Sequence, residues 1–482
     1  MNTQKNFLQN LQQNANETVT DNGAKSYISS LNTFVDFFFT LGSSRGKDIS
    51  PVMVKSFAED KSLAYKIALY MRDIREGQGE RQQFKNFIKN VVIPYENDEL
   101  NIVRLLHKIV ELGRFDDLEA FVGSKFETLA MTHWVEAIKA GNMLAAKWAP
   151  VKDKKGAKPL RSILGMNEVS WRKFVVPLRT TVEQQMCAHK WDEIEFGKLP
   201  SLAHSRYMKA FNKRCGELYA AYKESLVKGE AKINAGALYP YDVIKSISSL
   251  ASYRGWSSVD KSLFPVIDAQ WKALPDFVPE GLEILPIIDV SGSMTSQVPH
   301  SSVSCLDVAL SLGLYISERN KGIFKDYFMS FSNKPRLIHT TGTISQRIQQ
   351  AYHDDWAMST NIEAVFNLIL NTAVKMDATQ ESIPSLITII SDMQFNCVSG
   401  GNNKTIFETA KEKYSKHGYN LPKIVFWGVN SASNNTPVTF DENGTALVSG
   451  FSPSIVKSFL SAEFNPVGIM LETVDKDRYT IC

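Results

Sequence analysis

The C-terminal part of the chain alternates short β-branched runs with helical segments, and this pattern restricts the fold more than any other feature. Strands are predicted over 283–290, 327–331, 386–390 and 424–429, and helices over 303–317, 344–352, 362–374 and 406–414. Apolar runs such as EILPIIDV are typical of strands that are buried on both faces. Residues 280–482 are therefore predicted to form a doubly wound, Rossmann-like α/β domain with a parallel sheet.

The preceding part of the chain has helical periodicity instead. Short amphipathic segments, separated by Gly or Asp, cover 61–90, 101–112 and 128–146. Such a series favours a stack of helical hairpins, like an α-solenoid, over one large bundle. The sequence thus predicts a multidomain α plus α/β protein with a tail at 1–23, a helical domain at 24–279 and the α/β domain at 280–482.

Composition and cysteine content limit the class of protein. The chain has 482 residues, of which 44% are hydrophobic and 22% charged, values typical of a soluble protein with a large core. The N-terminus lacks a secretory signal, and the longest apolar run, near 284–290, is far shorter than the ~20 residues that span a bilayer. The five cysteines include no CxxC pair. We therefore expect free thiols, a cytoplasmic location and no membrane partner.

Charge is distributed unevenly along the chain. Residues 151–250 carry 18 basic and 10 acidic side chains, whereas residues 281–482 carry 15 basic and 19 acidic side chains. This asymmetry favours a polyanion as the partner of the helical part and a cation as the ligand of the α/β part. Nothing in the sequence indicates specificity for DNA.

The sharpest motif follows the first predicted strand of the α/β part. Asp289, Ser291 and Ser293 place a carboxylate and two hydroxyls at alternate positions of one turn. Asp392 follows the strand at 386–390, and Thr360 begins a predicted helix, so we expect both at the same sheet edge. These hard oxygen donors suit Mg²⁺ or another divalent cation. The alternative is a turn capped by its own Asp and Ser side chains.

This set of Asp289, Ser291, Ser293, Thr360 and Asp392 resembles the metal-ion-dependent adhesion site (MIDAS) that is the signature of von Willebrand factor A domains. No general base or nucleophile accompanies it in the sequence. The motif therefore predicts a binding site in a protein that is not an enzyme.

A wider resemblance covers residues 18–451, nearly the whole chain. Its segments are TVTDNGAKSYISS, FVDFFF, YMRDIREGQGERQQF, AAKWAP, WRKFVVPLR, MCAHKWDEIEFGKLPS, INAGALYPYDVIK and IISDMQFN. They resemble a von Willebrand factor A family of undetermined function, which is similar to the TROVE proteins that include the Ro autoantigen. This resemblance implies a ring of HEAT-like helical repeats, a C-terminal von Willebrand factor A domain and a ribonucleoprotein role, with single-stranded or small structured RNA bound on the ring.

Two basic clusters are the candidates for RNA contacts. The first is a loop that carries Lys152, Lys154, Lys155, Lys158 and Arg161, and the second is Arg172, Lys173 and Arg179 beside Trp171. The loop can neutralise phosphates, and the tryptophan can stack on a base. The alternatives are a solvated surface loop and a tryptophan that packs in the core.

Two further sets have competing interpretations. Arg75 and Arg81 can face phosphates, with Gly77 and Gly79 allowing close backbone approach, or they can belong to ion pairs that involve Asp73 and Glu80. The histidines His107, His133, His189 and His204 lie far apart in sequence and are expected to be core or surface residues. The leading functional hypothesis is an RNA-binding scaffold with a metal site, and the alternative is a metal-dependent protein-binding module without RNA.

Overall fold

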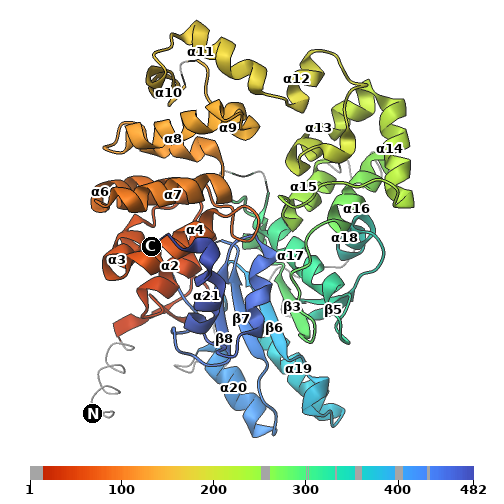
Figure 1. The fold of residues 1–482 in the computed structure, drawn as a ribbon. Coiled ribbons are helices and arrows are strands. Elements are labelled where there is room, and N and C mark those ends of the chain that lie inside the picture. The colour runs from red at the N-terminus through yellow and green to blue at the C-terminus, as the bar shows by residue number, and fades with distance from the viewer. Residues whose placement is uncertain are drawn as a thin grey trace. The chain divides into compact units, whose positions relative to one another are not determined.

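The computed structural model describes residues 15–152, 154–250, 261–299, 301, 303–331, 334–352, 361–396, 405–430 and 435–481. Their contacts divide the chain into two compact units, and Figure 1 labels most of the helices and strands in each. The sheet unit contains the residues up to Ile49, Tyr239–Ser249 and Asp276–Thr473. The helical unit contains Ser50–Leu238, Leu250–Pro275 and the residues from Val474. The predicted domains follow one another along the chain, whereas these contacts bring separate stretches of chain into each unit.

The sheet unit is built on six strands in the order β5-β4-β3-β6-β7-β8. All neighbours are parallel except β5, which pairs antiparallel with β4 at the edge. The strands are β3 (Ile284–Asp289), β4 (Tyr327–Phe331), β5 (Arg336–His339), β6 (Leu386–Ser391), β7 (Lys423–Gly428) and β8 (Thr445–Ser449). Every residue of β3 and β6 is buried, as their apolar runs predicted.

The direction of the chain reverses between β3 and β6. From β3 the chain passes to β4 on one side, and it later returns to β6 on the other side. Right-handed connections then place α17 (Cys305–Arg319) on one face and α19 (Ile362–Lys375) and α20 (Ile406–Lys416) on the opposite face. In such sheets, ligands bind at the carboxyl ends of the strands at this switch point.

The remaining elements of the sheet unit come from both ends and the middle of the chain. They are β1 (Glu17–Val19), β2 (Lys25–Tyr27), α2 (Thr33–Leu41), α15 (Pro240–Leu250), α18 (Ile344–Tyr352) and α21 (Pro466–Val474). β1 and β2 form an antiparallel hairpin, and α2 packs against β8. Residues 16–23 of the predicted tail thus belong to this hairpin and its turn.

The helical unit consists of short helices that pack on their neighbours along the chain. They are α3 (Ser50–Glu59), α4 (Lys61–Arg72), α5 (Gln82–Phe87), α6 (Ile93–Tyr95), α7 (Glu99–Leu112), α8 (Glu127–Lys139), α9 (Met143–Trp148), α10 (Ala157–Ile163), α11 (Glu168–Val175), α12 (Val182–Cys187), α13 (Ser201–Arg214), α14 (Gly216–Lys228) and α16 (Phe264–Lys272). Side-by-side packing includes α3 with α4, α4 with α7, α7 with α8, and α13 with α14. Edge-to-face contacts among Phe57, Tyr65 and Phe87, with ring centroids 5.3–6.2 Å apart, fill one of these junctions.

The structure confirms the α plus α/β class and most of the predicted elements. The interruption EGQGE separates α4 from α5, and β4 and α18 have the predicted bounds. The short edge strands β5 and β8 and the hairpin of β1 and β2 were not predicted. A closed ring of HEAT-like repeats stays a prediction. None of the helices in the described part of the chain combines the length and the hydrophobicity that a bilayer-spanning segment needs.

Candidate cation site and nucleic-acid interface

Two carboxylates meet at the switch point of the sheet. Asp289 is the last residue of β3, and Asp392 directly follows the last residue of β6. Ile288 of β3 pairs with Ile390 of β6 in parallel register, so the two strands end at the same edge. The structure therefore brings together the two acidic residues that the sequence predicted as metal ligands, although 102 positions separate β3 from the matching residues of β6.

Backbone and hydroxyl groups hold these carboxylates in place. Oδ1 of Asp289 accepts a hydrogen bond from the backbone N of Ser291 at 2.9 Å. The hydroxyls of Ser291 and Ser293 lie 3.0 Å apart. The Ser291 hydroxyl near Asp289 and the Ser293 hydroxyl near Asp392 each favour the charged form of that carboxylate and so act to lower its pKa. The two predicted hydroxyl donors thus lie between the two predicted carboxylate donors.

Burial destabilises the charged forms of these two carboxylates. Asp289 is 0% exposed and Asp392 is 3% exposed, and within the described residues neither pairs with a Lys or Arg. Burial, together with the nearby charge of Asp392, raises the pKa of Asp289 to about 7. Burial also raises the pKa of Asp392. A buried carboxylate pair of this kind is stabilised by a bound cation.

The donor set fits a hard divalent cation such as Mg²⁺. It consists of carboxylate and hydroxyl oxygens, and Ser293 is exposed, so one side of the set faces solvent. The predicted fifth ligand, Thr360, lies outside the described residues. Among the residues that the structure does describe, no group of three or more His, Cys, Asp or Glu side chains is arranged for a metal ion. Any cation here would be held by two carboxylates with hydroxyls and water.

Three further residues, which were not predicted, shape this edge. The Ser391 hydroxyl donates to Oδ2 of Asp289 at 2.7 Å and accepts from the backbone N of Met393 at 3.0 Å. Met393 has a φ of 65°, a left-handed conformation that is uncommon for a residue with a side chain. The turn that this conformation makes lets the backbone N of Gln394 donate to Oδ1 of Asp392 at 3.2 Å. The sequence feature that could have indicated these residues is the run Ser-Asp-Met-Gln, which directly follows the apolar part of a buried strand.

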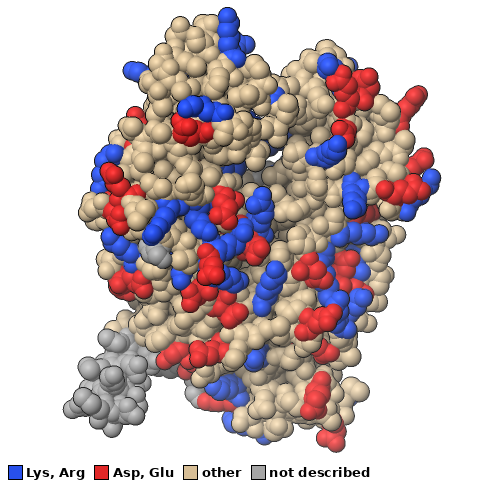
Figure 2. Space-filling view, viewed as in Figure 1, with Lys and Arg blue, Asp and Glu red and all other residues tan. Residues whose placement is uncertain are grey.

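Most of the predicted basic loop is exposed in the structure. Lys152, Lys154 and Lys155 precede α10, and Lys158 lies in its first turn. All four side chains are exposed, and Lys155 lies near enough to Glu119 to affect its pKa. In Figure 2, the surface around α10 and α11 shows several basic residues and few acidic ones. Arg172 and Lys173 on α11 are exposed as well.

The other predicted RNA contacts have protein partners instead. Arg161 lies 3.7 Å from a carboxylate oxygen of Glu168. Trp171 is 0% exposed, and its Nε1 donates to the carbonyl of Pro150 at 2.8 Å. Arg179 donates from Nε to the carbonyl of Ala146 at 3.0 Å and also bonds the carbonyl of Ala149. Trp171 therefore packs in the core, as one of its two interpretations predicted, and does not stack on a base. Arg179 bonds backbone carbonyls at the carboxyl end of α9.

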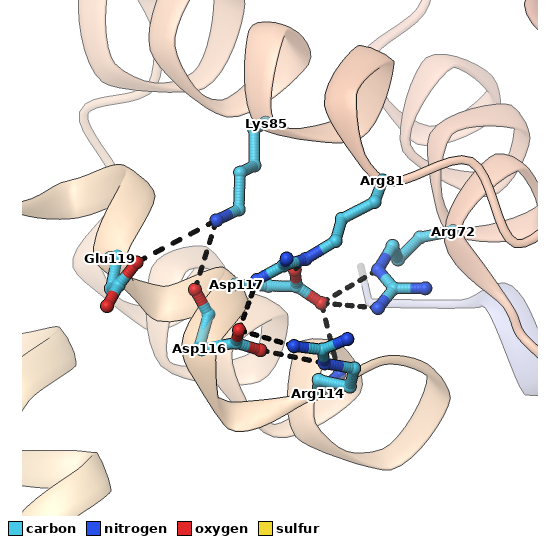
Figure 3. Close-up of polar contacts among 7 residues, drawn as sticks. All are labelled: Arg72, Arg81, Lys85, Arg114, Asp116, Asp117 and Glu119. Atoms are coloured by element: carbon cyan, nitrogen blue, oxygen red, sulfur yellow. Dashed lines mark hydrogen bonds and ion pairs between the residues drawn. The ribbon is translucent and has the colours of Figure 1, made fainter. Parts of the chain in front are cut away.

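Arg81 belongs to a partly buried ion-pair network with Asp116 and Asp117 (Figure 3). The structural interpretation thus holds for Arg81, although it had named Asp73 and Glu80 as the acidic residues. Its Nε donates to Oδ1 of Asp117 at 2.8 Å, and its guanidinium also bonds Asp116. Oδ2 of Asp117 accepts from Nε of Arg72 at 2.7 Å. Arg114 bonds both oxygens of Asp116. The network joins α4 and α5 to the turn at 115–121, so its role is structural.

Two more predicted residues have structural partners. Asp73 forms a two-bond ion pair with Arg478, with distances of 2.6 and 3.0 Å. This partner comes from the C-terminal end of the chain rather than from a neighbouring helical repeat. His204 is buried, and its Nε2 lies 3.0 Å from the hydroxyl of Tyr219.

Two of the histidines that were expected to be core or surface residues lie against each other. His107 on α7 is exposed, His133 on α8 is half-buried, and their ring centroids are 4.5 Å apart. Burial, together with the neighbouring His107, lowers the pKa of His133. Packing of α7 on α8 brings these residues together, and local periodicity carries no information about that contact.

Two parts of the chain match known protein families, and both families are domains of unknown function. Residues 283–477 match the domain of unknown function DUF7788. Residues 20–89 and 163–280 match the domain of unknown function DUF2828. Each match covers less than half of the chain, and neither description includes von Willebrand factor A or TROVE. The assignment of residues 280–482 to the von Willebrand factor A family stays a prediction.

Two individual proteins are similar over most of the chain. The uncharacterized protein L728 of Acanthamoeba polyphaga mimivirus is 28% identical over 521 residues, which cover 96% of this chain and 88% of that protein. The crystal structure of the Deinococcus radiodurans Ro (RSR) protein matches with a TM-score of 0.47 and 14% identity, over 93% of this chain and 100% of that chain. Neither likeness is large enough to establish a shared family or function.

Proposed function

We propose that the protein is a non-enzymatic binding scaffold whose sheet unit holds a divalent cation. The single observation that supports this role is the pair of buried carboxylates, Asp289 and Asp392, at the switch point of the sheet. Mg²⁺ would be held by these two residues with Ser291 and Ser293, and Thr360 is proposed as a further oxygen donor. When bound, the cation would offset the carboxylate charges and accept an additional oxygen ligand from the solvent side.

Calorimetric titration of the full chain with Mg²⁺ tests this role. Replacement of Asp289 by Ala removes the more deeply buried carboxylate, so the affinity for Mg²⁺ should fall by at least roughly tenfold. Glu381→Gln is the matched control, because Glu381 is an exposed acid beside the opposite, amino-terminal ends of the strands. Unchanged binding in Asp289→Ala, with a native near-ultraviolet circular dichroism spectrum, would show that the cation binds elsewhere.

For the helical unit we propose RNA binding. The exposed side chains of Lys152, Lys154, Lys155 and Lys158, with Arg172 and Lys173 on α11, support this proposal. The resemblance of the sequence to TROVE proteins supports it as well. Binding would depend on phosphate contacts and hence be weakly sequence-specific and strongly salt-dependent. Fluorescence anisotropy with a labelled single strand and a labelled stem-loop, over a range of KCl concentrations, tests it. The absence of binding at low salt would contradict it.

A second candidate function is protein binding through the cation. The exposed side of Ser293 favours it, because a carboxylate of a partner can approach the cation from there. The two functions respond differently to a chelator. EDTA should abolish a contact made through the cation and leave RNA affinity nearly unchanged, since the proposed RNA-binding residues belong to the other unit.

A further inference from the structure

The turn between β1 and β2 is anchored on the segment that directly follows Asp392. The Thr20 hydroxyl donates to the carbonyl of Phe395 at 2.7 Å. Gly23 forms an antiparallel bridge with Asn396. β2 is held by a second segment, since Tyr27 and Thr436 exchange two backbone hydrogen bonds of 2.8 Å. A hairpin from the start of the chain therefore lies fixed at the carboxyl edge of the sheet.

Gln394 connects this turn to the candidate cation site. Its side chain is 4% exposed, and its Oε1 accepts from the backbone N of Asp21 at 2.8 Å. Its carbonyl accepts from Nδ2 of Asn22 at 2.7 Å. Its backbone N donates to Oδ1 of Asp392. One buried residue thus bonds both a predicted cation ligand and the backbone of Asp21.

The turn itself is closed by local hydrogen bonds, so the position of Asp21 is well defined. The backbone N of Thr20 donates to the carbonyl of Ala24 at 2.8 Å, and the backbone N of Gly23 donates to the carbonyl of Thr20 at 2.9 Å. The Thr20 hydroxyl accepts from the backbone N of Ala24 at 2.9 Å. Gly23 has a φ of 85°, which favours glycine at this position. Asp21 is exposed at the tip of this turn.

We propose that Asp21 is a third carboxylate of the cation site, which raises its affinity through charge rather than by direct coordination. This inference rests on the proposed cation binding. Its geometric support is that the backbone N of Asp21 donates to Oε1 of Gln394, while the backbone N of Gln394 donates to Oδ1 of Asp392. These two hydrogen bonds hold the turn that carries Asp21 beside the segment that carries the second proposed ligand. The hairpin then serves as part of the site instead of being only a strand pair on the sheet.

Mg²⁺ titration of the full-length variant Asp21→Asn tests the inference. An exposed charge acts on a divalent cation through solvent, so we expect affinity to fall by about three- to tenfold at low salt. The loss should shrink in about 0.5 M KCl because salt screens exposed charges. Asp21→Glu keeps the charge and should bind Mg²⁺ nearly as the wild type does. A purely structural role of Asp21 would show no such dependence on salt or charge.

The outcomes separate this inference from the proposed function. If Asp21→Asn binds Mg²⁺ with wild-type affinity at low salt while Asp289→Ala loses binding, the inference is overturned and the cation site stands. If the wild type does not bind Mg²⁺, the proposed cation site is wrong and the inference fails with it. Thr20→Val removes the bond to Phe395 while keeping the charge. A loss of affinity in that folded variant would support the role of the docked turn, and unchanged affinity would argue against it.

Discussion

Arg72 and Asp117 form an ion pair from which solvent is excluded on both sides. Their side chains are 2% and 0% exposed, and the guanidinium approaches Oδ2 of Asp117 at 2.7 Å. Asp117 also accepts from Arg81 and from the backbone N of Arg114 (Figure 3). Asp117 therefore has partners for both carboxylate oxygens, and the cationic partners depend on its charge.

Asp117→Asn should strongly destabilise the helical unit. The substitution leaves Arg72 as a buried cation without a counter-charge, which costs about 3–5 kcal/mol in the free energy of unfolding. Urea denaturation followed by circular dichroism measures the change. Glu136→Gln is the control, since its ion pair with Lys139 has side chains 59% and 50% exposed. Loss of that exposed pair should cost less than about 1 kcal/mol. Similar effects in the two variants would refute the prediction.

His204 should make the helical unit less stable in weak acid. Burial lowers its pKa to about 4, whereas the unfolded chain takes up the proton near the ordinary value of 6.5. The stability linked to neutral His204 is therefore complete above about pH 6.5 and is lost as the pH falls towards 4, by up to about 3 kcal/mol. Urea unfolding between pH 7 and pH 4.5 should show a steeper loss in the wild type than in His204→Gln.

A change at an exposed histidine gives the comparison for that experiment. His189 is exposed and has a φ of 57°, a conformation that Asn also tolerates. His189→Asn should leave the pH dependence of unfolding unchanged. If it flattens the profile as much as His204→Gln does, the acid sensitivity has another origin.

Gly42→Ala should destabilise the sheet unit. A Cβ at this position would lie 2.5 Å from the Cα of Gly450, which is backbone and cannot turn aside as a side chain can. α2 would have to move away from the end of β8, at a cost of about 1–3 kcal/mol. Thermal unfolding measures the effect. Gly216→Ala meets no heavy atom within 4 Å of its Cβ and should be neutral or slightly stabilising.

The proposed RNA interface predicts a specific change in salt dependence. The triple variant Lys154→Gln, Lys155→Gln and Lys158→Gln removes three exposed charges next to α10. Each lost phosphate contact lowers the slope of log affinity against log salt by about 0.7–0.9, so we expect the slope to fall by about two. Affinity should weaken to a similar extent for all RNA sequences.

An equal change of charge elsewhere in the helical unit controls for net charge. Lys209, Lys213 and Lys228 are exposed on α13 and α14. Their joint replacement by Gln should leave the salt slope close to that of the wild type. Equal losses in the two triple variants would indicate non-specific attraction, and wild-type binding by the first variant would exclude the loop from the interface.

Much of the sheet unit was predictable because its signals are local. A buried strand such as β3 needs an unbroken apolar run, and its end is marked by the polar residue that follows, here Asp289 with its two serines. The order of strands and helices then places Asp289 and Asp392 at one edge, because parallel neighbours end together. Sequence alone therefore determined the fold class and predicted this pair of carboxylates.

Only the tertiary structure decided which polar residues face protein rather than solvent. Trp171 and Arg179 lie in a basic stretch of sequence, but carbonyls of residues 146–150 accept their hydrogen bonds. The turn of Asp21 reaches Gln394 across 373 positions of chain. Hydrophobic periodicity reports the face that a residue occupies within its own helix or strand. The partner of a polar side chain depends on contacts between distant segments, which form only when the whole chain packs.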